Sequence, residues 1–223
     1  MKKILLLLSF TGLFWMAAAA QKEDSSKTNK SSKKLGIGLK AGLNYSNVTN
    51  ASSINGSSQA GFHAGLFFGS FNKGLIGFRT ELLYSQQGYG YTSGSTQGSV
   101  GLNYIFLAPL LAINVTHFVQ IQAGFQTGYL LNAKADNNAG STGNQTADKI
   151  LQFYNRFDYG LCGGLEIHPI GGLLIGARYN LSLSNLYKMP DMSDSTGNAS
   201  YVPSASGINF KNNVVQIFVG YRF

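Results

Sequence analysis

A period of two residues runs through this chain from Leu35 to Phe223. In the first stretch, apolar side chains at every second position from Leu35 to Tyr45 alternate with glycine, lysine or asparagine. Successive side chains of a β-strand point to opposite faces, so this alternation predicts a strand with one apolar face and one glycine-polar face. Similar stretches follow at residues 61–69, 76–87, 102–113, 119–129, 156–167, 173–181 and 215–223. The sequence therefore predicts eight strands.

The fourth of these stretches has the weakest alternation. Residues 105–107 are three consecutive apolar side chains, and Pro109 interrupts the pattern. The contrast between its two faces is therefore the smallest of the eight stretches.

The side on which charge falls identifies the kind of sheet. The alternation puts eight charged side chains on the glycine-polar face, namely Lys40, Arg79, Glu81, Arg156, Asp158, Glu166, Arg178 and Arg222. A soluble sandwich would have to bury eight strongly apolar faces in one core. In a membrane barrel, lipid covers the apolar face, and a narrow lumen favours glycine beside a few paired charges. Stretches of roughly 9 to 13 residues also suit the ~9 to 11 that a tilted strand needs to cross a bilayer.

We therefore predict an all-β fold, an eight-stranded antiparallel transmembrane up-and-down β-barrel. A barrel of this size has room for side chains or one small ligand. We expect the eight charges to form a structural lumen network in which arginines pair with Glu81, Asp158 and Glu166. The alternative is a narrow or gated solute pore that prefers anions, because basic residues outnumber acidic ones on this face.

The connections between the strands alternate in length. Short joins occur at residues 72–74, 114–117 and 168–172, and long polar joins at residues 47–58, 88–99, 133–155 and 186–212. Outer-membrane barrels have short periplasmic turns and longer extracellular loops. We expect the same orientation here, with both chain ends in the periplasm.

The N-terminal region has the order of a secretory signal. Lys2 and Lys3 precede an apolar run from Ile4 to Met16 and four alanines that end at Ala20, so residues 1–20 are interpreted as a signal peptide. Residues 21–34 carry five lysines against two acidic residues and are interpreted as a flexible basic periplasmic segment. The barrel domain then spans residues 35–223.

Composition narrows the functional classes. Charged residues make up 12% of the chain, about half the ~25% of soluble domains, which argues against a water-soluble enzyme. The formal net charge is +8, but much of it lies in the N-terminal region, where no aromatic residues interleave with the lysines of the 21–34 segment. No nucleic-acid partner is therefore expected.

Reactive side chains are scattered. His63, His117 and His168 lie on three different segments, and the single Cys162 alternates with glycine, as a small lumen filler would. We predict no catalytic, cofactor or metal site. Two further alternatives are a lipid-modifying barrel enzyme, which needs a Ser/His/acid set, and a secreted barrel that binds an apolar ligand, which needs its apolar face turned inward.

Five motifs in order resemble one family across nearly all of residues 35–223. They are the Arg79–Gly88 stretch, Asn103-Tyr104 followed by Pro109-Leu-Leu, Phe157-Asp-Tyr-Gly160 with Gly163-Gly164, Gly176-Ala-Arg-Tyr179 and the closing Gly220-Tyr-Arg-Phe223. Together they are similar to the PorT-like outer-membrane β-barrel domain. This resemblance implies an eight-stranded barrel in a bacterial outer membrane and says little about activity.

The last residues resemble a terminal assembly signal. Val219, Tyr221 and Phe223 place three large side chains on the predicted outward face, and the chain stops at an aromatic residue. The expected partners are outer-membrane lipid, the barrel-assembly machinery during biogenesis, and surface or secretion partners of the long loops. We expect a monomeric, non-enzymatic barrel with an envelope structural, surface-contact or secretion or transport accessory role.

Overall fold

The computed structural model describes residues 35–49, 55–70, 74–93, 96–137, 154–187 and 210–223. The predicted signal peptide (1–20) and basic segment (21–34) lie outside these residues. Within the described ranges, no helix is both long and apolar enough to cross a bilayer.

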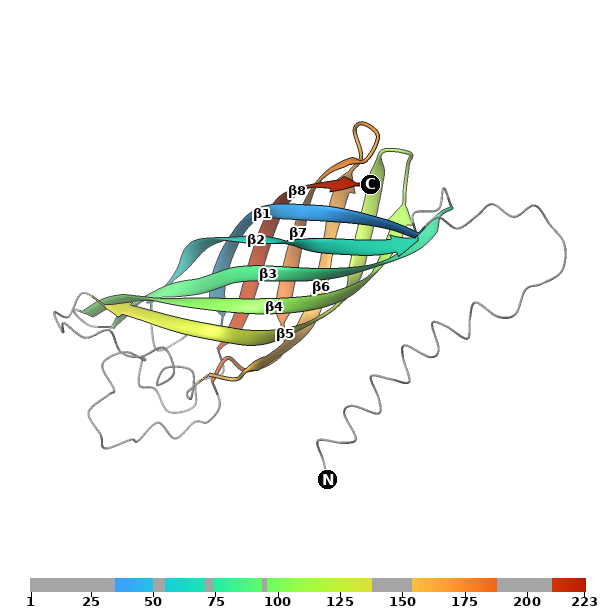
Figure 1. The fold of residues 1–223 in the computed structure, drawn as a ribbon. Coiled ribbons are helices and arrows are strands. Elements are labelled where there is room, and N and C mark those ends of the chain that lie inside the picture. The colour runs from blue at the N-terminus through green and yellow to red at the C-terminus, as the bar shows by residue number, and fades with distance from the viewer. Residues whose placement is uncertain (1–34, 50–54, 71–73, 94–95, 138–153, 188–209) are drawn as a thin grey trace, which may run out of the picture. The chain divides into compact units, whose positions relative to one another are not determined.

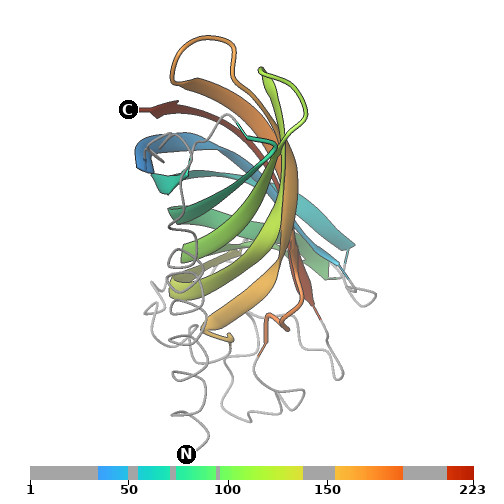
Figure 2. The same cartoon turned by 90° about the vertical axis from the view of Figure 1, so that its right-hand side faces the viewer.

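Eight antiparallel strands form a closed barrel (Figures 1 and 2), which confirms the predicted fold class. The strands are β1 (Leu35–Thr49), β2 (Asn55–Ser70), β3 (Ile76–Ser93), β4 (Thr96–Asn114), β5 (Val119–Asn137), β6 (Phe157–Ile167), β7 (Leu173–Ser182) and β8 (Lys211–Arg222). Each strand pairs with the next, and β8 closes the ring against β1 from Gly38↔Arg222 to Thr49↔Lys211. Closure leaves no free sheet edge, as a bilayer requires.

The two ends of the barrel differ. Strands β2, β4 and β6 end at one end of the barrel, where the last residue of the chain also lies, and we call this the turn end (Figure 1). Strands β1, β3, β5 and β7 end at the opposite end, which we call the loop end.

Several strands are longer than the sequence predicts. β4 and β5 have 19 residues each, and β3 runs on to Ser93, so most of the predicted long join at residues 88–99 is a paired hairpin. This expectation was wrong because Ser, Thr and Gly do not prevent pairing when alternate residues are buried. Tyr89, Tyr91 and Val100 supply that burial inside the barrel.

The apolar positions face outward, as predicted. Ile37, Leu39 and Leu43 are about half exposed on the outer wall, whereas Lys40 and Asn44 between them are buried inside. A lipid bilayer would cover this wall.

The alternation of apolar and polar residues is indistinct in β4 because both faces of this strand are apolar. Phe106 and Leu110 are buried inside, while Ile105 and Ile113 face outward. On β2, Phe67 breaks the pattern by pointing inward. It fills the space left by Gly38, where a Cβ would lie 2.1 Å from Phe67 Cζ.

Aromatic side chains mark two levels on the outer wall. Toward the loop end, register aligns Tyr84, Ile105, Tyr129 and Phe157 across four strands. Toward the turn end, the exposed aromatic residues are Phe68, Phe78, Phe118, Tyr221 and Phe223. Apolar bands between aromatic girdles are typical of barrels that cross a membrane.

Candidate functional site in the lumen

A charged layer crosses the lumen in its turn-end half. Glu81 on β3 is its centre, with Lys40 Nζ 3.0 Å away, Arg178 Nη1 2.7 Å away and Arg79 Nε 3.2 Å away. Arg79 also donates to both carboxylate oxygens of Glu166, through Nη1 at 2.9 Å and through Nη2. Each of these five side chains is at most 3% exposed. Buried ions persist only with such partners, and here three cations share two carboxylates.

Neutral and aromatic groups complete this layer. Gln122 on β5 accepts from Arg178 Nη2 at 2.7 Å and donates to Glu166. Lys40 Nζ lies 3.5 Å from the centre of the Phe218 ring, and the Arg79 guanidinium 5.0 Å from the Phe67 ring. These cation–π contacts give the inward-pointing Phe67 a role that strand periodicity did not reveal.

Asp158 lies apart from this layer, nearer the loop end. Its Oδ1 accepts hydrogen bonds from Ser182 Oγ at 2.5 Å and from Ser184 Oγ. Within the described part of the chain it has no ion pair, so the expected pairing of Asp158 with an arginine was wrong. The reason is its height in the barrel, since Asp158 is eight residues along β6 from Glu166.

One arginine also differs from the lumen assignment. Arg156 is exposed, and its Nη1 donates to Tyr129 Oη at 3.3 Å, so its assignment to the lumen was wrong. Arg156 precedes the first residue of β6 and lies at a bend, where strand alternation no longer applies. Arg222, the last residue of β8, is half-buried at the turn end.

A neutral polar layer lies between the charged layer and the loop end. Asn44 Oδ1 is 2.8 Å from His63 Nδ1 and accepts from Gln216 Nε2 at 3.0 Å, while Asn44 Nδ2 donates to Ser85 Oγ at 2.9 Å. The hydrogen-bond network continues through Gln87, which donates a hydrogen bond to Ser85 and accepts one from Asn212. Sequence reasoning missed this layer because neutral inward residues carry no charge signal.

The loop-end part of the lumen is apolar and aromatic. It contains three tyrosines, Tyr89, Tyr154 and Tyr187, which we call the tyrosine cap. Tyr89 Oη lies 3.0 Å from Tyr154 Oη and also bonds Tyr187, and Tyr154 Oη and Tyr187 Oη are 3.3 Å apart. The cap packs on Val48, Tyr91, Val100, Leu102, Tyr104, Phe106, Leu130, Ala133, Leu186 and Phe210.

Burial changes the chemistry of the cap. Tyr154 and Tyr187 lie outside the named strands and are joined by an isolated bridge. Burial raises the pKa of Tyr187 to about 12 and the pKa of Tyr154 well above its ordinary value. Both hydroxyls therefore stay neutral at physiological pH.

The other candidate reactive groups are dispersed. His63 is in the neutral layer, His117 lies between β4 and β5, and His168 follows β6 with Nε2 3.4 Å from Glu166 Oε1. Cys162 is buried against Ala108 and Leu110. In the part of the chain that the structure describes, no three His, Cys, Asp or Glu residues gather where they could hold a metal.

Several solved protein structures are similar to this chain. Ail, the attachment invasion locus protein of Yersinia pestis, is 15% identical with a TM-score of 0.45, and the match covers 84% of this chain and 98% of Ail. Neisserial surface protein A is 14% identical with a TM-score of 0.48, covering 84% and 97%. OprG from Pseudomonas aeruginosa is 13% identical with a TM-score of 0.41, covering 86% and 97%. Among curated proteins, no sequence matches this chain.

A family profile identifies the chain more directly. The profile described as "Outer membrane protein beta-barrel domain" matches residues 19–188, which is most of the chain. The match and the lipid-compatible outer wall agree on the cell outer membrane as its location and on lipid as its surroundings. The protein belongs to the outer membrane protein β-barrel domain family.

Proposed function

We propose that this protein is a non-enzymatic outer-membrane barrel with a side-chain-plugged lumen, whose contacts are made by its loop end. Such a barrel would contribute to envelope structure, make surface contacts, or act as an accessory protein in secretion or transport. The observation that carries the proposal is the stacking along the lumen of three layers of buried side chains that bond one another: the charged layer, the neutral layer and the tyrosine cap. The five sequence motifs support a PorT-like assignment within the family.

The charge balance supports a plug over an anion path. With Arg156 exposed and Arg222 at the turn end, the buried lumen charges in the described residues are Lys40, Arg79 and Arg178 against Glu81, Asp158 and Glu166. The formal charges buried in the lumen of the described residues therefore sum to zero, with three cations and two carboxylates in the charged layer and Asp158 nearer the loop end. The dispersed histidines and the buried Cys162 likewise offer no nucleophile with a base.

The orientation proposed is the one common to outer-membrane barrels, with the turn end and both termini in the periplasm and the loop end outside. The partners proposed are outer-membrane lipid, the barrel-assembly machinery during biogenesis, and surface or secretion proteins at the loops. We propose a monomer that binds no nucleic acid.

Single-channel recording in planar bilayers tests the plug. The mature protein should give no steady conductance. A matched variant, Glu81→Ala with Arg178→Ala, removes the central ion pair without adding charge and should raise the frequency of transient openings. A stable large current in the unmodified protein would replace the plug with the pore alternative. Lipase and acyl-transfer assays on the same sample test the absence of enzymatic activity.

A further inference from the structure

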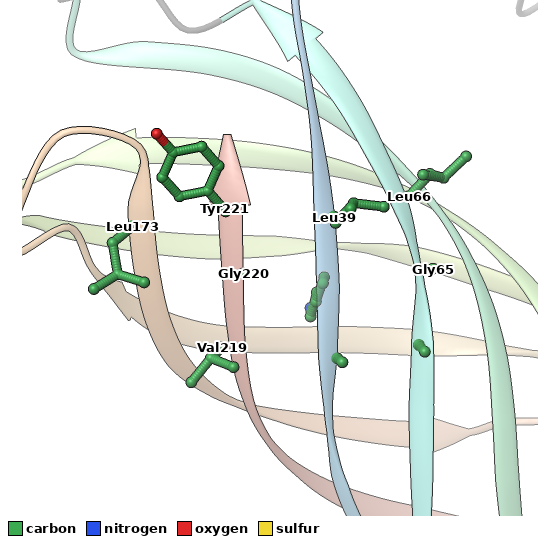
Figure 3. A pocket seen from close by; sticks show the side chains of 10 residues that line it. Leu39, Gly65, Leu66, Leu173, Val219, Gly220 and Tyr221 are labelled. Carbon is green, nitrogen blue, oxygen red and sulfur yellow. The ribbon is translucent and has the colours of Figure 1, made fainter. Parts of the chain in front are cut away.

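An apolar groove lies on the outer wall where the barrel closes, across β8, β1 and β2 (Figure 3). It has a volume of about 500 Å³. Its lining residues are Leu39, Lys40, Ala41, Ala64, Gly65, Leu66, Leu173, Val219, Gly220 and Tyr221. We call it the outer groove.

Register explains why the wall is hollow here. The floor is the row Gly220, Lys40 and Gly65, which are paired across the three strands. Lys40 turns its side chain into the lumen, and Gly65 and Gly220 lie on the same inward face of their strands as Lys40, so the outer wall at this row is bare backbone. Figure 3 shows the side chains of Leu39, Leu66, Val219 and Tyr221 around this floor.

The two sides of the groove differ in height. On the side of the groove nearer the turn end, Leu39 pairs with both Leu66 and Tyr221, which gives a row of three large side chains. On the loop side, Ala41 pairs with Ala64 and Val219, so two of the three side chains are single methyl groups. The groove is therefore a shallow, apolar hollow that is open to the surroundings of the barrel.

The edge of the groove nearer the turn end contacts the turn between β6 and β7. Gly172 has φ +84°, and its carbonyl accepts from Arg222 N at 2.7 Å. A Cβ on Gly172 would lie 3.0 Å from Tyr221 Cε2, so a larger residue would displace the tyrosine ring. Tyr221 also packs edge-on against Phe223, with ring centres 5.4 Å apart. The Tyr221 ring thus lies among the turn-end aromatic residues, a level where aromatic side chains meet lipid headgroups.

We propose that the outer groove is a binding site for one acyl chain of a glycerophospholipid in the turn-end leaflet. The groove is continuous with the lipid-facing wall, and its lining side chains other than Lys40 and Tyr221 are hydrocarbon. An unfilled hollow forfeits dispersion contacts along its walls, and a flexible methylene chain restores them.

Photo-crosslinking of the full mature chain in phospholipid nanodiscs tests this site. The probe is a trace of phosphatidylcholine with a diazirine midway along one acyl chain, and labelled peptides are identified by mass spectrometry. Peptides from β1, β2 and β8 should carry several-fold more label than those from β4 and β5. Ala41→Leu with Ala64→Leu fills the groove and should bring this label down to the β5 level.

Ala123→Leu is the matched control because Ala123 is also an exposed alanine, but on β5 outside the groove. It should leave the label on β1, β2 and β8 unchanged. Heat-modifiable migration checks that each variant folds, and Ala64→Leu alone replaces the double variant if that one does not. Equal labelling of all strands, or unchanged labelling in the filled variant, would overturn the site. The site would also be overturned if unlabelled lipid A displaced the probe more strongly than unlabelled phosphatidylcholine does. Cross-linked dimers whose formation depends on Ala64 would overturn it as well.

Discussion

Arg178 and Glu81 meet across the lumen although they are 97 residues apart in the sequence, with Nη1 2.7 Å from Oε2 and Nη2 2.9 Å from Oε1. This two-pronged contact joins β7 to β3. Lys40 on β1 shares Glu81 Oε2, so three separate strands are tied to one carboxylate. Loss of that carboxylate is therefore the most informative single change in the barrel.

Glu81→Gln should lower the free energy of unfolding in detergent by roughly 3 to 5 kcal/mol, because it leaves buried cations without their carboxylate. Arg156→Gln is the control, since this exposed arginine should change stability by no more than about 0.5 kcal/mol. Urea unfolding followed by tyrosine fluorescence measures both. Equal losses in the two variants would mean that Arg156 contributes to the lumen after all.

Asp158→Asn should cost less than Glu81→Gln, about 1 to 2 kcal/mol, because Asp158 is held by two serine hydroxyls and by no described cation. Asn keeps the size and one carbonyl acceptor for those hydroxyls. The same unfolding experiment, with Ser182→Ala as a second variant, measures the loss. A cost as large as that of Glu81→Gln would indicate a cationic partner for Asp158.

Deletion of residues 221–223 should leave the protein unassembled in cells. It removes the aromatic end that resembles an assembly signal and the hydrogen bond from Phe223 N to Ile37 O at 2.9 Å, which helps to close β8 on β1. Heat-modifiable migration of membrane fractions reports assembly. Phe223→Tyr keeps the aromatic ring and should assemble normally, and normal assembly of the deletion would rule the signal out.

Alkaline pH should destabilise the loop end through the tyrosine cap. The folded-state pKa of Tyr187 is raised from 10.0 to about 12 by burial, so its contribution to stability is complete below the unfolded value and is lost as pH rises through the folded one. Tyrosinate absorbance together with circular dichroism should detect this loss between pH 10 and 12. Tyr187→Phe removes the ionisable group and should reduce that loss, and an unaltered profile would assign it to other tyrosines.

The sequence alone determined the number of strands, the closed barrel and the face of most residues, because each follows from a local alternation with period two. Ile37, Leu39 and Leu43 could be assigned to the outer wall without a structure. The alternation did not distinguish the two faces of β4, because both of them are apolar. It also gave the wrong face for Arg156, because this residue lies just before β6 begins. Strand length was also underestimated, since buried Tyr89 and Tyr91 extend β3 through a polar stretch.

Only the tertiary structure decided which inward groups meet. Glu81, Asp158 and Glu166 share a face in the sequence pattern, yet Glu81 bonds Arg178, Glu166 bonds Arg79, and Asp158 bonds two serines. The outer groove likewise depends on Ala41 lying beside Ala64 and Val219. Contacts across the lumen and rows along the wall are set by strand register and barrel closure, which place residues at common heights. Alternation fixes the direction of a side chain but carries no information about its height.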